Sequence, residues 1–448
     1  MSVPALGLIS FAFGFAALKN AWSYWNWSLC AVGVAAALYF LLTLQSETRP
    51  IGRVYTVLLL IFSGVALLQL LPLPIALVSV VSPARIELLH ATEAVLAGSV
   101  QFVTLSAIPS QTSGHAVGLF ACILVFFVAR DLSTRFAERS LYWTTVWPLL
   151  IVATFEAALG CVQAFIPGGE GLARGTYPSR DHYAGLLELV VPFALLYPAA
   201  IMQRTNAHYG SWAASAFKAC SVLAVAAAIL TAIIYSLSRM GFLAMLAGLF
   251  VAGSLVLSRN RNATAAGPLA NRRKYLPVVS VAGIVFLGLI YLPTDALIAR
   301  FSDLTKAEGL NADTRALIWR ESLSLARDFP VFGCGLGGFE SCFLRYKTAA
   351  PMGTVSYAHN DYLQILAEMG VLAFGAGLLL AFGILRTAVR NAIHAASADE
   401  RYLSVACAAA LVAILLHSTV DFNLYRPANA TAVAWIAGIA MSVRPSKR

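Results

Sequence analysis

The chain has 448 residues, of which 59% are hydrophobic and 12% are charged, and its formal net charge is +10. Soluble domains carry about 25% charged residues, so this composition excludes an ordinary soluble protein. The net charge would suit a nucleic-acid-binding protein, but the basic residues lie in short segments between apolar runs, which argues against that class.

Apolar runs long enough to cross a bilayer recur along the whole chain. A spanning helix needs roughly 20 mostly apolar residues, and the alternating polarity of barrel strands does not occur here. We therefore predict an all-α polytopic membrane protein with about 12 transmembrane helices. No secretory signal peptide is expected, because the first residues lack a basic segment. The predicted spans are residues 3–18, 22–44, 54–72, 113–130, 141–165, 183–202, 219–237, 240–257, 276–292, 363–385, 403–418 and 428–443.

Lys and Arg in short loops predict the orientation, because they collect on the cytoplasmic side of a membrane. The stretch Ser258–Lys274 holds five basic residues and no acidic residue. The predicted spans place this stretch, the other basic loops and both termini in the cytoplasm. The opposite, outer face then receives residues 73–112, 166–182, 293–362 and 419–427. The first of these segments is expected to be a loop with short helical pieces.

This topology divides the chain into three parts. Residues 1–292 hold the first nine helices with short loops, residues 293–362 form one large outer loop that carries candidate catalytic residues, and residues 363–448 hold the last three helices and a cytoplasmic C-terminus. Within the large loop, Asp313 is the expected N-cap of an amphipathic helix over residues 314–328. The predicted apolar face of this helix consists of Ala316, Trp319, Leu323 and Ala326.

Glycines follow this helix in a pattern that also occurs in dinucleotide-binding proteins. Gly333, Gly335 and Gly338 match the G-x-G-x-x-G spacing, but no βαβ unit surrounds them. We therefore predict a turn and not a nucleotide site. Cys334 and Cys342 share this polar loop, and we expect free thiols, although pairing on an oxidising face stays open.

Short polar motifs in or next to the outer segments are the candidates for chemistry. Arginine keeps its charge and binds phosphate oxygens through two parallel hydrogen bonds, so several arginines on one face indicate a diphosphate. His359, at the end of the long loop, is the candidate for proton transfer. The alternatives are that each arginine pairs with a carboxylate or a phospholipid headgroup, and that His359 is a structural residue at a helix start. The candidate residues are Arg180, His182, Arg239, Arg315, Arg320, His359, Asn360 and Asp421.

Three carboxylates lie within predicted spans, at Glu156, Glu188 and Glu368. Ionisable groups inside a membrane are costly and are functional candidates by default. Glu368 would lie roughly 13 Å deeper than His359 along a continuous helix, which suits a structural contact better than attack on a sugar. We interpret all three as structural. No clustered ligands predict a metal site on the outer face, so we expect a metal-independent reaction.

Short motifs from Gly175 onward, which include the candidates Arg180, Arg239, Arg315, His359 and Asp421, resemble those of the O-antigen ligase and polymerase superfamily of bacterial envelope enzymes. The resemblance covers roughly the C-terminal two-thirds of the chain, from Gly175 onward, in pieces whose order and spacing around one long loop are specific. The pieces are Gly175–Glu188, Ser238-Arg239-x-Gly241, Thr314-Arg315-x-x-x-Trp319, Pro330–Phe339, His359-Asn360 followed after nine residues by Gly370, and His417-Ser-x-x-Asp421-Phe-x-Leu.

The resemblance implies a GT-C-like fold in the bacterial inner membrane, with the active site facing the periplasm. It implies a glycan donor carried on undecaprenyl diphosphate, already activated, so that no cofactor is needed. A ligase would pass the glycan to the core sugars of lipid A, and a polymerase would pass it to a second lipid-linked repeat unit. The catalytic residues of the family map onto His359, Arg315 and Arg239, and Arg180 corresponds to a further family arginine.

Two readings from other classes compete with this one. A transporter or flippase would use Glu156, Glu188 and Glu368 for proton or ion coupling, although no inverted repeat is visible. A purely structural membrane scaffold would leave the polar motifs unexplained. The sequence alone does not separate a ligase from a polymerase.

Overall fold

The computed structural model describes residue 14 and residues 25–43, 50–96, 98–167, 171–208, 211–258, 312–348 and 353–442. Within these residues, seven helices are long and apolar enough to cross a membrane. The prediction of an all-α multi-pass membrane protein is therefore confirmed. The seven comprise α6 (Pro109–Glu138), α7 (Trp147–Phe165) with the preceding 3-10 helix η1 (Tyr142–Val146), α8 (Arg180–His208), α9 (Trp212–Tyr235), α10 (Arg239–Ser258), α16 (Asp361–His394) and α17 (Ala398–His417).

Other predicted spans correspond to shorter helices or lie outside the described residues. The shorter apolar helices are α2 (Trp25–Thr43), α3 (Arg53–Leu68) and α18 (Pro427–Ser442). The predicted span 276–292 lies outside the described residues, as does the span 3–18 except for residue 14. The total of about 12 spans therefore stays a prediction.

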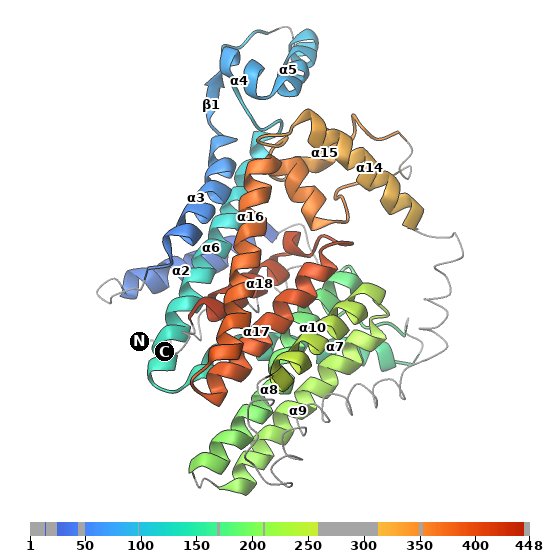
Figure 1. The fold of residues 1–448 in the computed structure, drawn as a ribbon. Helices are drawn as coiled ribbons and strands as arrows, with labels where there is room; N and C mark the ends of the chain where they lie inside the picture. Colours follow the sequence, from blue (N-terminus) through green and yellow to red (C-terminus); the bar gives the residue numbers. More distant parts are fainter. Residues whose placement is uncertain are drawn as a thin grey trace.

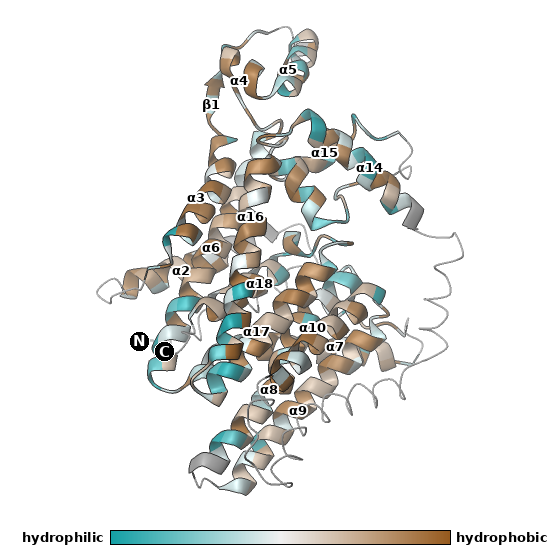
Figure 2. Cartoon of the chain, viewed as in Figure 1, coloured by the Kyte–Doolittle hydropathy of each residue, from teal (hydrophilic) through white to brown (hydrophobic). Residues whose placement is uncertain are grey.

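The centre of the bundle is formed by α8 and α17, whose side chains are mostly buried, whereas α16 has a larger lipid-facing share. Small residues allow the close packing of these helices. A Cβ at Gly248 of α10 would lie 2.7 Å from the Ala409 carbonyl oxygen of α17, so only glycine allows this approach. Figure 2 shows apolar residues along α3, α6 and α16 and hydrophilic residues gathered near α5 and α14.

Short elements outside the spanning helices gather at one end of the bundle, at the top of Figure 1. The strand β1 (Pro72–Pro74) pairs antiparallel with β2 (Phe102–Thr104), with Leu73 opposite Val103. Between these strands lie α4 (Ile75–Val81) and α5 (Pro83–Leu96), which confirms the expected short helical pieces, although the strands were not predicted. The helices α14 (Ala312–Asp328) and α15 (Phe339–Phe343) lie at the same end, where Arg345 contacts Glu87 at 2.7 Å.

The loop helix α14 exists where it was predicted, but two details of the prediction are wrong. The helix begins at Ala312, so Asp313 lies inside its first turn and is not the N-cap. The buried face is also different, because Ala316 is exposed and Leu323 is 40% exposed. The residues that point inward are Ile318, Glu321, Ser322, Leu325, Ala326 and Phe329.

Hydrogen bonds explain why polar residues occupy the inner face of α14. The Glu321 carboxylate accepts hydrogen bonds from the backbone N–H and the hydroxyl of Thr348, at 2.7 and 2.8 Å. The Ser322 hydroxyl donates to the Ile318 carbonyl oxygen at 2.6 Å. A buried polar group costs little free energy of folding once it is hydrogen-bonded. Residue polarity alone therefore predicts the wrong buried face for this helix.

A break in α16 is closed by the glycine-rich turn that follows α14. At Gly370 the backbone has φ 70° and ψ −178°, which is not helical. The turn fills the break, because Cys334 N–H donates to the Ala367 carbonyl at 2.9 Å, Gly335 N–H to Glu368 at 3.0 Å, and Val371 N–H to Pro330 at 2.8 Å. The glycine pattern is therefore a turn, as predicted. The backbone N–H and carbonyl groups of the turn form hydrogen bonds with the backbone groups that the break in α16 would otherwise leave unpaired in an apolar environment.

We predict that Gly370→Ala destabilises the protein while Gly375→Ala on the same helix does not. A Cβ at Gly370 would collide with the Val331 carbonyl, and its backbone conformation costs other residues about 1–3 kcal/mol. A Cβ at Gly375 would meet nothing within 4 Å. Unfolding of the purified variants in detergent measures both changes, and equal stability of the two would refute the importance of the break.

Candidate functional site

The candidate site is built around the carboxylate of Asp421, in the segment between α17 and α18. Asp421 is 3% exposed. Its Oδ1 atom lies 3.4 Å from Nε2 of His182 and 3.6 Å from Nδ1 of His359. Three segments that are far apart in the sequence thus bring two histidines to one acid.

The surroundings of Asp421 favour its ionised form. Burial alone would raise the pKa of Asp421, but the neighbouring histidines, His182 first among them, outweigh burial and hold the pKa well below its usual range. The Phe422 N–H also donates to Oδ1 at 2.9 Å. Asp421 is therefore a carboxylate at neutral pH, and it can orient an imidazole and stabilise its protonated form.

Both ring nitrogens of His182 face protein groups. Nδ1 accepts a hydrogen bond from Nε of Arg426 at 3.0 Å, so the hydrogen of a neutral ring is on Nε2, which faces Asp421. The guanidinium of Arg426 also lies 4.8 Å from the Phe422 ring centre. Arg426 was not among the residues predicted for the site, although a basic residue in a short outer segment was a usable signal.

His359 is the more accessible of the two histidines. Its side chain is 24% exposed, against 2% for His182. Its backbone lies in the left-handed region with φ 49°, and its carbonyl accepts a hydrogen bond from the Trp319 indole at 3.4 Å. The ring packs edge-on against Phe422, with centres 5.0 Å apart. One nitrogen therefore faces the carboxylate while part of the ring stays open to a substrate.

Asn360, one of the candidate residues predicted from the sequence, lies at the start of α16. Its side-chain oxygen accepts hydrogen bonds from the N–H groups of Tyr362 and Leu363, and its amide donates to the Thr419 carbonyl at 2.8 Å. Asn360 thus caps α16 and holds it against the segment that carries Asp421.

The predicted arginines lie on three helices, with Arg180 and Arg239 at the starts of α8 and α10 and the other two on α14. A 2.6 Å hydrogen bond from Ser238 to Asp181 joins the starts of α10 and α8, and Arg239 and Arg180 are the next residues in the chain. Arg315 lies one helical turn before Trp319 on α14, and its buried Nε has no hydrogen-bond partner among the described residues. Arg320 is exposed and is not part of this group.

Four helices begin within or next to the group, at Arg180 for α8, Arg239 for α10, Asp361 for α16 and Pro427 for α18. Helix N-termini carry partial positive charge and exposed N–H groups, which favour anions. Together with the arginines, they make this end of the bundle suitable for a negatively charged ligand.

The three membrane carboxylates are each bound by protein groups. Glu156 accepts from the N–H and hydroxyl of Thr176, at 2.9 and 2.7 Å. Glu188 lies 3.0 Å from Nδ1 of His417, and both side chains are fully buried. Glu368 accepts from Gln364, from the Phe339 N–H and from the Tyr425 hydroxyl. Their contacts agree with a structural interpretation, which stays a prediction.

The described parts of the chain contain few groups that could bind a metal ion or act as a reactive thiol. No three His, Cys, Asp or Glu side chains there converge so as to hold a metal ion. Cys334 and Cys342 are both free and buried. Burial and the neighbouring Cys342 thiol raise the pKa of Cys334 well above its usual value, with the contact to Cys342 contributing most.

An apolar cavity of about 260 Å³ adjoins the site at Tyr425 and Arg426. It lies between α3, α6, α16 and α18. Besides these two residues, it is lined by Phe62, His115, Gly118, Leu119, Cys122, Leu336, Ile365, Met369, Leu424, Pro427, Ala430, Val433 and Ala434.

Residues 223–378 match the family model of the O-antigen ligase domain. The predicted resemblance to the O-antigen ligase and polymerase superfamily is thereby confirmed for this segment. The matched segment includes Arg239, Arg315, His359 and the turn at the α16 break, whereas His182, Asp421 and Arg426 lie outside it. A search of curated proteins found no match. The family supports an enzyme that processes glycans in a membrane.

Proposed function

We propose that this protein is a membrane glycosyltransferase that moves a glycan from undecaprenyl diphosphate to an acceptor hydroxyl. The observation that carries the proposal is the pair of histidines on the buried Asp421, next to the starts of α8, α16 and α18. In this proposal, the site lies at the periplasmic face of the inner membrane. The proposal also includes about 12 transmembrane spans in a GT-C-like arrangement.

The proposed reaction is a single displacement at the anomeric carbon of the donor sugar. The acceptor hydroxyl loses its proton to His359 and forms the new C–O bond. The bond from the anomeric carbon to the phosphate oxygen breaks, and the diphosphate leaves with the electron pair. Arg239, Arg315 and Arg180, with the helix N-termini, stabilise the charge that develops on the diphosphate, which makes a metal ion unnecessary.

Asp421 and His182 have supporting roles in this mechanism. The carboxylate faces one nitrogen of His359 and stabilises the imidazolium that forms when the ring takes the proton. His182 is held by Arg426 and faces the same carboxylate, so it positions Asp421 and is not itself the base. The adjoining apolar cavity is suited to the isoprenoid part of the donor.

The identity of the acceptor distinguishes two kinds of enzyme in this superfamily, a ligase and a polymerase. We favour a ligase that uses the core of lipid A, and the alternative is a polymerase that uses a second lipid-linked repeat unit. Both employ the same donor site and the same base. The transporter alternative has less support, because Glu156, Glu188 and Glu368 are each engaged by neighbouring protein groups.

We predict that His359→Ala reduces turnover about 10²–10⁴-fold, the usual contribution of a general base. Donor binding should be largely kept, because the arginines hold the diphosphate. Glycan transfer from a purified lipid-diphosphate donor measures the rate.

His90→Ala is the matched control for this experiment, because His90 is exposed on α5, away from Asp421. It should transfer glycan at the normal rate. Melting temperature and donor affinity of His359→Ala distinguish catalysis from folding. A well-folded His359→Ala protein with near-normal turnover would remove this residue from the mechanism.

We predict that Arg315→Lys reduces transfer about 10- to 100-fold, because a hydrogen bond to a charged group is worth about 1.5–3 kcal/mol. Lysine keeps the charge but cannot reproduce the two parallel bonds of a guanidinium. Arg327→Lys, at the exposed end of the same helix, is the control and should keep full activity. Equal activity of both variants would leave the diphosphate site without support.

The proposed topology predicts the location of reporter proteins fused to the chain. Fusions after Lys274 and Arg401 should lie in the cytoplasm, because basic residues collect there. A fusion near Glu308 should lie in the periplasm. A cytoplasmic signal at Glu308 would place the candidate site on the wrong side for a periplasmic donor.

A further inference from the structure

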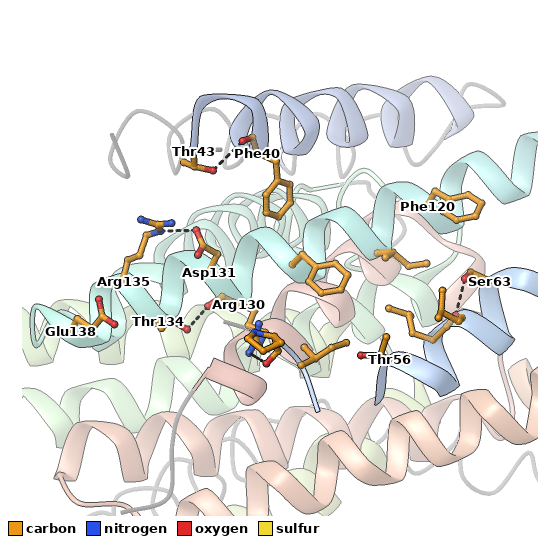
Figure 3. Close-up of a pocket in the computed structure, with 16 residues that line it drawn as sticks. Phe40, Thr43, Thr56, Ser63, Phe120, Arg130, Asp131, Thr134, Arg135 and Glu138 are labelled. Carbon is orange, nitrogen blue, oxygen red and sulfur yellow. Dashed lines mark hydrogen bonds and ion pairs between the residues drawn. The ribbon is translucent and has the colours of Figure 1, made fainter. Parts of the chain in front are cut away.

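A second cavity lies near the far half of α6, away from the candidate site. Its volume is about 680 Å³, and it is bounded by α2, α3 and α6 (Figure 3). The candidate site adjoins α6 near His115, and the new cavity extends from Phe120 to Glu138 along the same helix. The rise along the helix from Phe120 to Glu138 is about 27 Å.

The lining of this cavity changes from apolar to charged along α6. Figure 3 shows Phe120 toward one end and Arg135 with Glu138 toward the other. The apolar part is lined by Phe40, Ile51, Leu59, Leu60, Phe120, Ile123 and Phe127. The polar part is lined by Arg130, Asp131, Thr134, Arg135 and Glu138. A lining of this kind matches a molecule with a polar head and an apolar tail.

The cavity adjoins surfaces of lipid-facing character. Leu60 lines it and is 64% exposed, and the neighbouring Leu41 and Leu42 of α2 are 63% and 66% exposed. Exposed leucines on membrane helices contact acyl chains, so a membrane lipid can reach the cavity from the bilayer. A water-soluble ligand would have to pass the same apolar surface.

Among the described lining residues, positive and negative charges at the polar end are equal in number. Arg130 and Arg135 contribute two positive charges, and Asp131 and Glu138 contribute two negative charges. Asp131 is fixed in place, because its Oδ2 accepts from Arg135 at 2.7 Å and from the Tyr39 hydroxyl. A headgroup with only a phosphate would meet repulsion from both carboxylates, whereas a headgroup that also carries an ammonium group meets partners of both signs.

We propose that this cavity binds one membrane phospholipid whose headgroup contains both a phosphate and a primary ammonium group. The arginines bind the phosphate, the carboxylates bind the ammonium group, and an acyl chain lies along Phe120, Phe127 and Leu59. The lipid fills the space between α2 and α3, where both helices approach α6. This site does not depend on the proposed transferase activity.

The test compares phosphatidylethanolamine with phosphatidylglycerol of the same acyl chains. The detergent-purified full chain is examined by native mass spectrometry for retained lipid and by thermal unfolding after lipid addition. Phosphatidylethanolamine should be retained at one molecule per chain and should raise the melting temperature, and phosphatidylglycerol should do so several-fold more weakly. Glycerophosphoethanolamine, which has the headgroup without acyl chains, should have no effect at equal concentration.

Thr56→Trp and Val57→Trp form a matched pair of variants. Thr56 is exposed at the surface of α3 and lines the cavity, so a tryptophan there occupies the space of the lipid. Val57 is the next residue, is 54% exposed and does not line the cavity. Thr56→Trp should lose the retained lipid and the thermal response, and Val57→Trp should keep both.

Glu138→Gln tests the headgroup without filling the cavity. It should reduce the preference for phosphatidylethanolamine over phosphatidylglycerol several-fold, because one partner of the ammonium group is lost. The proposal is overturned if the wild-type chain retains neither lipid, if it binds the two lipids equally, or if Thr56→Trp and Val57→Trp bind alike.

Discussion

The need to compensate one buried carboxylate determines the architecture at the candidate site. An unpaired charge in an apolar bundle would cost more than a fold can tolerate, so Asp421 requires His182 and His359 beside it. The segment that carries Asp421 is itself held by α16. Asp361 donates its N–H to the carbonyls of Ser418 and Asp421, and its carboxyl group accepts from the Ser418 hydroxyl and the Leu424 N–H. These reciprocal bonds fix the start of α16 against the segment that carries Asp421.

A second constraint is that a helix broken inside a membrane must have its backbone groups satisfied. The break at Gly370 is filled by the glycine turn, and Gln69 of the segment after α3 adds a hydrogen bond to the Glu368 carbonyl at 2.7 Å. The glycine turn also contacts the segment just before α6, because Ala107 N–H donates to the Cys334 carbonyl at 2.8 Å. The described part of the polar loop, residues 312–348 and 353–362, therefore packs against the bundle, and Trp319 of α14 reaches the His359 carbonyl.

Hydropathy and short motifs predicted much of this structure, and the remainder depended on contacts that no local pattern encodes. Long apolar runs predict helices because the bilayer imposes their length. Of the short motifs, the structure places His359 beside Asp421 and joins Ser238, the neighbour of Arg239, to Asp181. The inward face of α14 was predicted incorrectly, because the hydrogen bonds of Glu321 come from Thr348, 27 positions away. The position of Arg426 beside His182 likewise joins residues 244 positions apart. Pairings of that kind arise from tertiary packing, so the sequence indicated the members of the site without their arrangement.

The two histidines on Asp421 are distinguished by their backbones and their exposure. His182 lies in the first turn of α8, is 2% exposed and has a guanidinium on its other nitrogen, so nothing in its surroundings admits a substrate. His359 has φ 49°, a conformation that is uncommon outside glycine although histidine, asparagine and aspartate adopt it more often than other residues. Such a conformation persists where the surroundings over-determine it, here through Trp319 at its carbonyl and the Asn360 cap that follows. The chain thus holds a partly exposed imidazole in one orientation, an arrangement that suits the general-base role proposed for His359.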